Sequence, residues 1–119
     1  MDRVSFIQHK GKKILQIDFT DCHKDEVLKV IEMAKKTISH EPKNSVLTLT
    51  KVANTKYDTN TSEALKEYTN HNKPYVKAAA VIGLSGLQKV LYMTIVRFTG
   101  RNLQLFDDDT TAKDWLCTQ

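Results

Sequence analysis

The chain has 119 residues, a length typical of one domain, and we expect a single domain over residues 1–119. Apolar residues make up 40% and charged residues 27% of the chain, which excludes disordered and fibrous classes. The net charge of +4 is spread along the chain. Because nucleic-acid-binding proteins cluster their basic residues on one face, we expect no nucleic-acid partner.

Cysteine usage and hydropathy exclude further classes. Two cysteines, Cys22 and Cys117, are too few for a disulfide framework or a thiolate metal site. The longest mainly apolar run, residues 76–84, contains Lys77 and is too short to span a bilayer. With no leader-like segment at the start, the sequence predicts a cytoplasmic protein without integral membrane association. It also predicts no metal and no cofactor.

The first third of the chain predicts a hairpin and a helix. Residues 4–7 and 13–19 are rich in β-branched and aromatic side chains and flank Gly11, which can adopt the positive φ of a tight turn. Residues 21–40 then change to helical periodicity, with one apolar stripe at Val27, Val30, Ile31, Ala34 and Ile38.

The middle of the chain predicts strand, helix and strand. Residues 45–52 are rich in β-branched side chains. Residues 76–83 are almost continuously apolar, as in a central strand that is covered by helices on both sides or, on one side, by another layer. Between them, Asn60 followed by Glu63 fits a capping pattern for a helix that Pro74 follows.

The last third predicts helix, strand and helix. A capping box at Ser85 opens a helix to about residue 99, residues 103–106 form a short strand, and residues 107–109 are aspartates suited to cap a last helix ending near Cys117. The predicted order is ββαβαβαβα. Such alternation indicates an α/β fold with about four helices and a mostly parallel sheet, edged by the antiparallel hairpin.

Several short motifs, in this order, resemble those of a known family. They are residues 72–77 (NKPYVK), the turn 83–87 (GLSGL), Gly100-Arg101 and residues 112–116 (AKDWL). Together they resemble the small bacterial SpoIIAA-like proteins of the STAS fold, also labelled STAS/SEC14-like, over essentially the whole chain. The resemblance implies a STAS-like fold and leaves the biochemical activity open.

The resemblance also implies a candidate phosphorylation switch. Anti-sigma-factor antagonists of the STAS fold carry an Asp-Ser pair at the start of their second helix, where a partner kinase phosphorylates the Ser. The corresponding residues here are Asp58 and Thr59, with Thr61 or Ser62 nearby. Thr replaces Ser and the following Gly-containing turn is absent, so the alternative interpretation is that this segment caps the helix.

The predicted helix over residues 87–99 has two apolar stripes. One is suited to the core, whereas Tyr92, Met93 and Val96 form a second stripe, with Lys89 and Arg97 nearby. Because a second apolar side is either buried within the monomer or covered by a partner, these residues predict a homodimer interface or additional core.

Lys77 and Arg101 form a third candidate group. Lys77 interrupts an apolar strand, so its side chain must reach water or a counter-charge. Arg101 follows the Gly100 turn, where its donors could hold main-chain carbonyls or a carboxylate. Either both residues line an anionic ligand or partner site, or Lys77 extends to solvent and Arg101 ties down a loop.

No catalytic constellation is recognisable. The turn at residues 83–87 has Leu87 where a nucleophile elbow requires glycine, and every histidine precedes Ser85. The sequence therefore predicts a non-catalytic regulatory protein that acts by protein–protein binding. The alternative, suggested by the SEC14-like label and the apolar helix, is a carrier or sensor of a lipid or other apolar small molecule.

Overall fold

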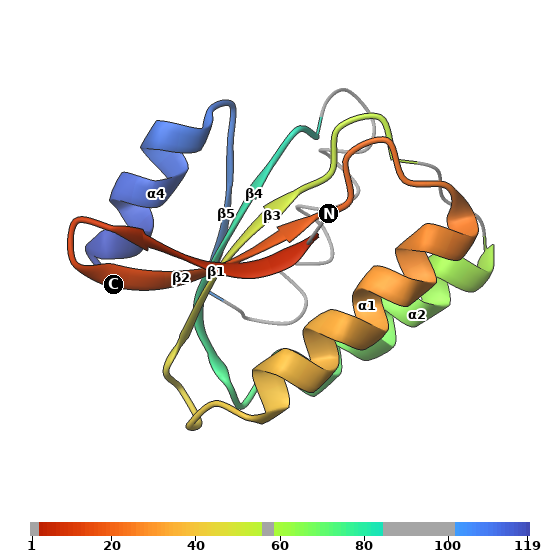
Figure 1. Cartoon of the computed structure of the whole chain (residues 1–119), viewed down its shortest axis with the longest axis horizontal. Helices are drawn as coiled ribbons and strands as arrows, with labels where there is room; N and C mark the ends of the chain where they lie inside the picture. The colour runs from red at the N-terminus through yellow and green to blue at the C-terminus, as the bar shows by residue number, and fades with distance from the viewer. Residues whose placement is uncertain (1–2, 56–58, 85–101) are drawn as a thin grey trace.

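The computed structural model describes residues 3–55, 59–84 and 102–119. Five strands and three helices occupy these ranges, in an α/β arrangement that confirms the predicted fold class (Figure 1). Their bounds are β1 (Val4–His9), β2 (Lys12–Asp18), α1 (Lys24–Ser39), β3 (Val46–Lys51), α2 (Thr59–Asn72), β4 (Val76–Ile82), β5 (Leu103–Phe106) and α4 (Asp109–Cys117). The helix predicted over residues 87–99 lies outside the described residues.

The strands form one sheet in the order β1-β2-β3-β4-β5. Strands β1 and β2 are antiparallel, whereas β2, β3, β4 and β5 run parallel to one another. Since α1 connects β2 to β3 and α2 connects β3 to β4, each helix returns the chain to the same end of the sheet. The predicted mostly parallel sheet with an antiparallel hairpin is confirmed.

A two-residue turn closes the hairpin. Lys10 and Gly11 both have positive φ, 49° and 79°, and His9 pairs with Lys12. Two consecutive positive φ values match the right-handed twist of the flanking strands, which is why glycine suits this position.

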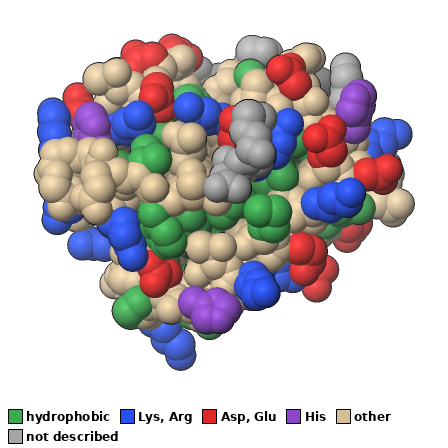
Figure 2. All heavy atoms as spheres, in the orientation of Figure 1, with side chains coloured by type: hydrophobic (Ala, Val, Ile, Leu, Met, Phe, Trp, Pro, Cys, Tyr) green, Lys and Arg blue, Asp and Glu red, His purple; other side chains and the backbone are tan. Residues whose placement is uncertain are grey.

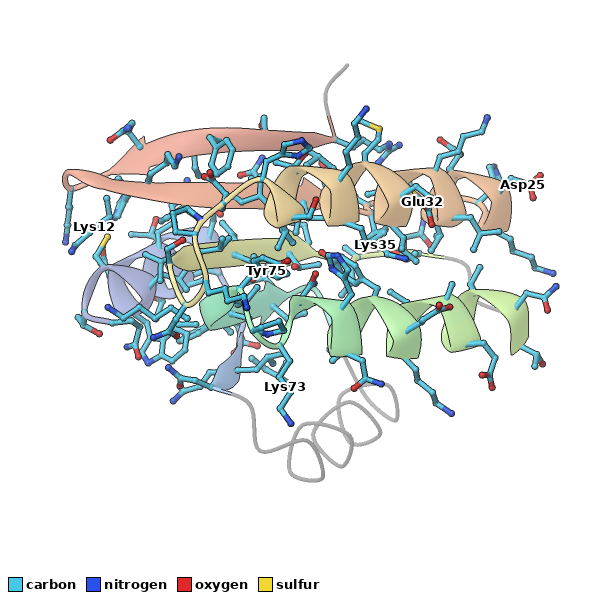
Figure 3. All side chains as sticks on the ribbon, turned by 90° about the horizontal axis from the view of Figure 1, so that it is seen from below. Lys12, Asp25, Glu32, Lys35, Lys73 and Tyr75 are labelled. Atoms are coloured by element: carbon cyan, nitrogen blue, oxygen red, sulfur yellow. The ribbon has the colours of Figure 1, made fainter. Side chains whose placement is uncertain are left out.

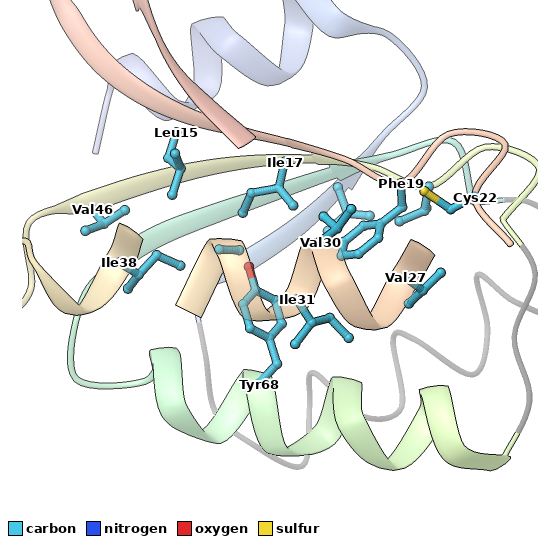
Figure 4. Packing of buried hydrophobic residues seen from close by; sticks show 13 residues of the cluster. Leu15, Ile17, Phe19, Cys22, Val27, Val30, Ile31, Ile38, Val46 and Tyr68 are labelled. Carbon is cyan, nitrogen blue, oxygen red and sulfur yellow. The ribbon is translucent and has the colours of Figure 1, made fainter. Parts of the chain in front are cut away.

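Helices cover the sheet on both faces, with α1 and α2 on one side and α4 on the other (Figure 1). Neighbouring residues of β2 therefore enter different cores: Leu15 packs toward α1, and Ile14 packs toward α4. Figure 4 shows the larger cluster, in which Ile17 and Phe19 approach α1 and Tyr68 reaches in from α2. In the described ranges, no helix has the length and apolar character that crossing a membrane requires.

Helix α1 is shorter at its start than the predicted range of residues 21–40. Asp21 has a left-handed φ of 60°, which a right-handed helix cannot include, so the helix begins at Lys24. The His23 amide donates to Glu26 Oε1 at 3.3 Å and so satisfies one donor at the helix start.

Candidate functional site

The carboxyl ends of four parallel strands meet at one edge of the sheet. The loops after β2, β3, β4 and β5 begin there, and helices α1 and α4 start from it. Helix α2 begins on the same side, four residues after Thr55. In open α/β sheets this carboxyl edge is the usual place for ligands and partners. We therefore treat it as the candidate functional site.

A polar brace joins the loops after β2 and β3. Asn54 Nδ2 donates to Asp21 Oδ1 at 2.6 Å, and the Asp21 amide donates to the Ala53 carbonyl at 3.1 Å. Asn54 and Asp21 both hold left-handed backbone conformations, φ 54° and 60°. Asn and Asp tolerate this region better than other non-glycine residues. The two residue types that form the side-chain hydrogen bond are therefore also suited to the backbone conformation of these loops.

A buried hydroxyl ties the same loops together beneath the brace. Thr55 Oγ1 lies 2.8 Å from the carbonyl oxygens of both Phe19 and Val52 and is buried. The Phe19 amide in turn donates to the Lys51 carbonyl at 2.8 Å. These contacts satisfy main-chain groups where the strands end, and they hold the edge in one shape.

Glycine is required where β4 leaves the sheet. Gly83 has a φ of 97°, and a Cβ placed there would lie 2.7 Å from the Ala53 amide nitrogen. The loops after β3 and β4 therefore approach more closely than any side chain allows.

The start of α2 carries the predicted phosphorylation switch. Thr59 is the first residue of α2 and is exposed, whereas Thr61 is fully buried. Ser62 lies in the first turn of α2, and Asp58 lies outside the described residues. Of the side chains that the structure describes in this predicted switch, that of Thr59 is exposed at the helix start and that of Thr61 is buried.

The prediction that Asn60 caps this helix is wrong. Helix α2 already begins at Thr59, so Asn60 lies within the first turn. Asp, Thr and Asn are all good N-caps and follow one another at positions 58–60, so the sequence could not locate the helix start to within one residue.

Lys77 lies at the opposite end of the sheet from Thr59. It follows Val76 at the amino end of β4, where the register with β3 shifts between Val46 and Leu47. The shift leaves Lys77 as an extra residue between the paired Val76 and Ala78, and its side chain is exposed. This bulge explains how a lysine is accommodated in an otherwise apolar central strand.

The other predicted site residues are not described. Arg101, the proposed companion of Lys77, lies outside the described residues, and so does the predicted interface of Lys89, Tyr92, Met93 and Val96. The ligand site of Lys77 with Arg101 and the interface on residues 87–99 remain sequence-based predictions.

Asp108, one of the three aspartates that the sequence offers as caps, caps α4. The Thr111 amide donates to Asp108 Oδ1 at 2.7 Å, and this bond, with that from the Thr111 hydroxyl, lowers the pKa of Asp108. Asp109 Oδ2 lies 2.8 Å from Lys113 Nζ. Among the residues that the structure describes, no three His, Cys, Asp or Glu side chains gather in a way that could hold a metal ion.

A polar cluster that sequence analysis missed joins the hairpin tip to α4. Asp114 Oδ1 lies 2.8 Å from His9 Nε2 and 2.9 Å from Lys10 Nζ. The Cys117 thiol donates to the His9 carbonyl at 3.2 Å. Since His9 and Asp114 are 105 positions apart, no local pattern could have indicated this contact.

We expect Asp114→Asn to make the protein less sensitive to acid. Hydrogen bonds from His9 and then Lys10 lower the pKa of Asp114 below its ordinary value of 3.8. The ionised carboxylate therefore stabilises the fold above that value, and this contribution is lost as the pH falls through the folded-state pKa. Urea unfolding at about pH 6 and about pH 2.5 should show a larger acid loss for wild type than for the variant. Equal losses would contradict the expectation.

The two cysteines are unremarkable in this setting. Cys22 is buried, and burial raises its pKa, which disfavours the reactive thiolate. Cys117 is half-buried beside His9. Both are free thiols, in line with the absence of a sequence motif around them.

Comparison with known proteins bears on the fold. Neither a family model nor a curated protein matches the sequence. A solved structure does match: an uncharacterised protein of the DUF3478 family, with a SpoIIAA-like fold, from Shewanella loihica PV-4. The two chains share 15% identity with a TM-score of 0.79, over 96% of this chain and 92% of the other. The predicted resemblance is confirmed at the level of architecture, and we conclude that this chain has the SpoIIAA-like fold.

Proposed function

We propose that the chain is a non-catalytic binding protein of the bacterial cytoplasm that regulates a protein partner through the carboxyl edge of its sheet. The observation that carries this proposal is an exposed Thr59 at the start of α2, the helix that follows β3. The Asp21–Asn54 brace holds the loops after β2 and β3 in shape. A surface that is ordered before binding loses less conformational entropy when a partner docks.

The polar groups at this edge support binding rather than turnover. The Thr55 hydroxyl contacts two main-chain carbonyls, and Asp21 accepts from Asn54. In the described part of the edge, these groups stabilise loops and do not form the nucleophile–base pair that acyl or phosphoryl transfer would use. Figure 2 shows Lys and Arg mixed with Asp and Glu over the visible face, which suits a folded protein partner better than a polyanion.

Phosphorylation of Thr59 would regulate the partner. A phosphate there would lie at the first turn of α2, where helix amides lack intrahelical acceptors, and would add about −1.5 to −2 charges. The added charge changes the surface that the partner contacts without requiring a change in the core.

We expect Thr59→Asp to weaken the partner complex about tenfold or more, since the substitution places a carboxylate at the regulated position. Affinity capture from the native cell, with quantitative mass spectrometry, identifies proteins held by wild type. Titration calorimetry with the purified partner then measures the affinity of each variant. Thr110→Asp is the matched control, because Thr110 is also exposed in the first turn of a helix, α4.

Two results would contradict this function. The first is a partner that binds wild type and Thr59→Asp equally well. The second is a stoichiometric apolar small molecule that co-purifies with the chain in native mass spectrometry, which would favour the carrier function instead. Thermal unfolding of wild type, Thr59→Asp and Thr110→Asp shows whether a loss of binding comes from a lost contact or from an unfolded variant.

A further inference from the structure

Strand β1 forms one border of the sheet. In the described residues its one strand partner is β2, because β1 is the first strand in the order β1-β2-β3-β4-β5. Figure 3 shows the β1–β2 hairpin along the upper margin of the ribbon, where no described helix or strand lies beyond it. The outer side of β1 therefore presents its main chain to the surroundings.

The hydrogen-bonding register shows which main-chain groups point outward. The Asp18 amide donates to the Arg3 carbonyl at 2.8 Å, and the pairing of β1 with β2 continues without a shift to His9 opposite Lys12. Antiparallel strands exchange hydrogen bonds at every second residue. Ser5, Ile7 and His9 therefore face β2, while the amides and carbonyls of Val4, Phe6 and Gln8 point away from it.

Strand β1 lacks the features that keep sheet edges from pairing. Natural edges are kept short, carry charged residues or proline, or contain a bulge. The six residues of β1, VSFIQH, include no lysine, arginine, acid or proline, and their register is regular. The other border strand, β5, has four residues. The sheet is thus open to strand addition on the β1 side.

We propose that β1 pairs with β1 of a second copy of this chain. In the antiparallel arrangement that a two-fold axis requires, Phe6 lies opposite Phe6 of the partner subunit, and Val4 lies opposite the partner's Gln8. All outward groups of Val4, Phe6 and Gln8 then find an acceptor or a donor in the other copy. The two five-stranded sheets become one continuous ten-stranded sheet.

The side chains along β1 suit this self-pairing. Phe6 is 40% exposed, so its ring is available to meet the ring of the second copy at the axis. Lys13 Nζ lies 4.3 Å from the centre of the Phe6 ring and 2.7 Å from Glu41 Oε1. Glu41 thus supplies a counter-charge within each subunit for the lysine that lies beside Phe6.

The expected dimer is a weak one. A pair of six-residue strands buries less surface than the roughly 1,600 Å² of a standard interface, so we expect dissociation in the micromolar range. The contact runs along the outer side of β1, and it uses neither Thr59 nor any of residues 89–96. Its success or failure is therefore independent of the proposed function and of the interface predicted on residues 87–99.

Sedimentation velocity from about 5 to 500 μM tests the dimer, because this range brackets micromolar dissociation. We expect wild type and Gln8→Ala to dimerise with rising concentration. Gln8→Pro removes an outward amide without touching the β2 ladder, and Phe6→Lys places like charges at the axis. Gln8→Pro and Phe6→Lys should each raise the dissociation constant of the dimer at least tenfold, and each should keep a wild-type circular dichroism spectrum.

Amide exchange measured by nuclear magnetic resonance tests the register. The amides of Val4, Phe6 and Gln8 should become protected only at high concentration, whereas those of Ser5 and Ile7 should be protected at every concentration. The proposal is overturned by a wild type that stays monomeric at 500 μM. It is equally overturned by a dimer that Met93→Glu abolishes but folded Gln8→Pro and Phe6→Lys retain.

Discussion

We expect Phe19→Ala to lower the free energy of unfolding by about 4 kcal/mol, the cost typical of emptying a buried aromatic site. Phe19 is 2% exposed and belongs to the core between the sheet and α1, where Figure 4 shows its ring near Val30. Its main chain also binds Lys51 and Thr55, so the substitution leaves a cavity directly below the candidate site.

Phe6→Ala is the matched control for this prediction. The Phe6 side chain is 40% exposed, and we expect its removal to cost about 1 kcal/mol or less. Urea unfolding below the dimerisation concentration measures both variants. Similar losses for Phe6→Ala and Phe19→Ala would mean that the core between the sheet and α1 does not have the packing described.

We expect Gly83→Ala to lower the free energy of unfolding by about 3 kcal/mol, because overpacking and backbone strain act together. The added Cβ would lie 2.7 Å from the Ala53 amide nitrogen, and the φ of 97° is unfavourable for alanine. Because this contact joins the loops after β3 and β4, we also expect faster amide exchange at Asn54.

Gly11→Ala separates backbone strain from the clash. Gly11 also has a positive φ, 79°, but a Cβ there would meet nothing within 4 Å. We therefore expect a loss of only about 1 kcal/mol, from the left-handed conformation alone. Thermal unfolding of both variants checks the difference, and equal losses would show that the Ala53 contact is unimportant.

Much of the fold could be predicted because its signals are local. The strand predicted over residues 103–106 matches β5, and the predicted role of Gly11 in the hairpin turn is confirmed by its φ. The apolar stripe from Val27 to Ile38 matches the buried face of α1. Periodicity, turn chemistry and capping depend on neighbours a few residues apart, which a single sequence contains.

Element boundaries were less predictable. Helix α1 starts at Lys24 rather than residue 21, and α2 starts at Thr59, before Asn60. Near the start of each helix, several residues are suited to the N-cap position, so the sequence allows more than one first helical residue. The choice among them depends on tertiary contacts such as the Asp21–Asn54 brace, which fixes Asp21 outside the helix.

By itself, the sequence determined the order of the described strands and helices, the mostly parallel sheet and the resemblance to SpoIIAA-like proteins, since alternation and short motifs are visible along the chain. Only the tertiary structure decided how the candidate site is built. The contacts of Asp21 with Asn54, of Gly83 with Ala53 and of His9 with Asp114 span 33, 30 and 105 positions. Such contacts arise when crossover helices return distant strands to neighbouring positions in one sheet, and no local pattern records them.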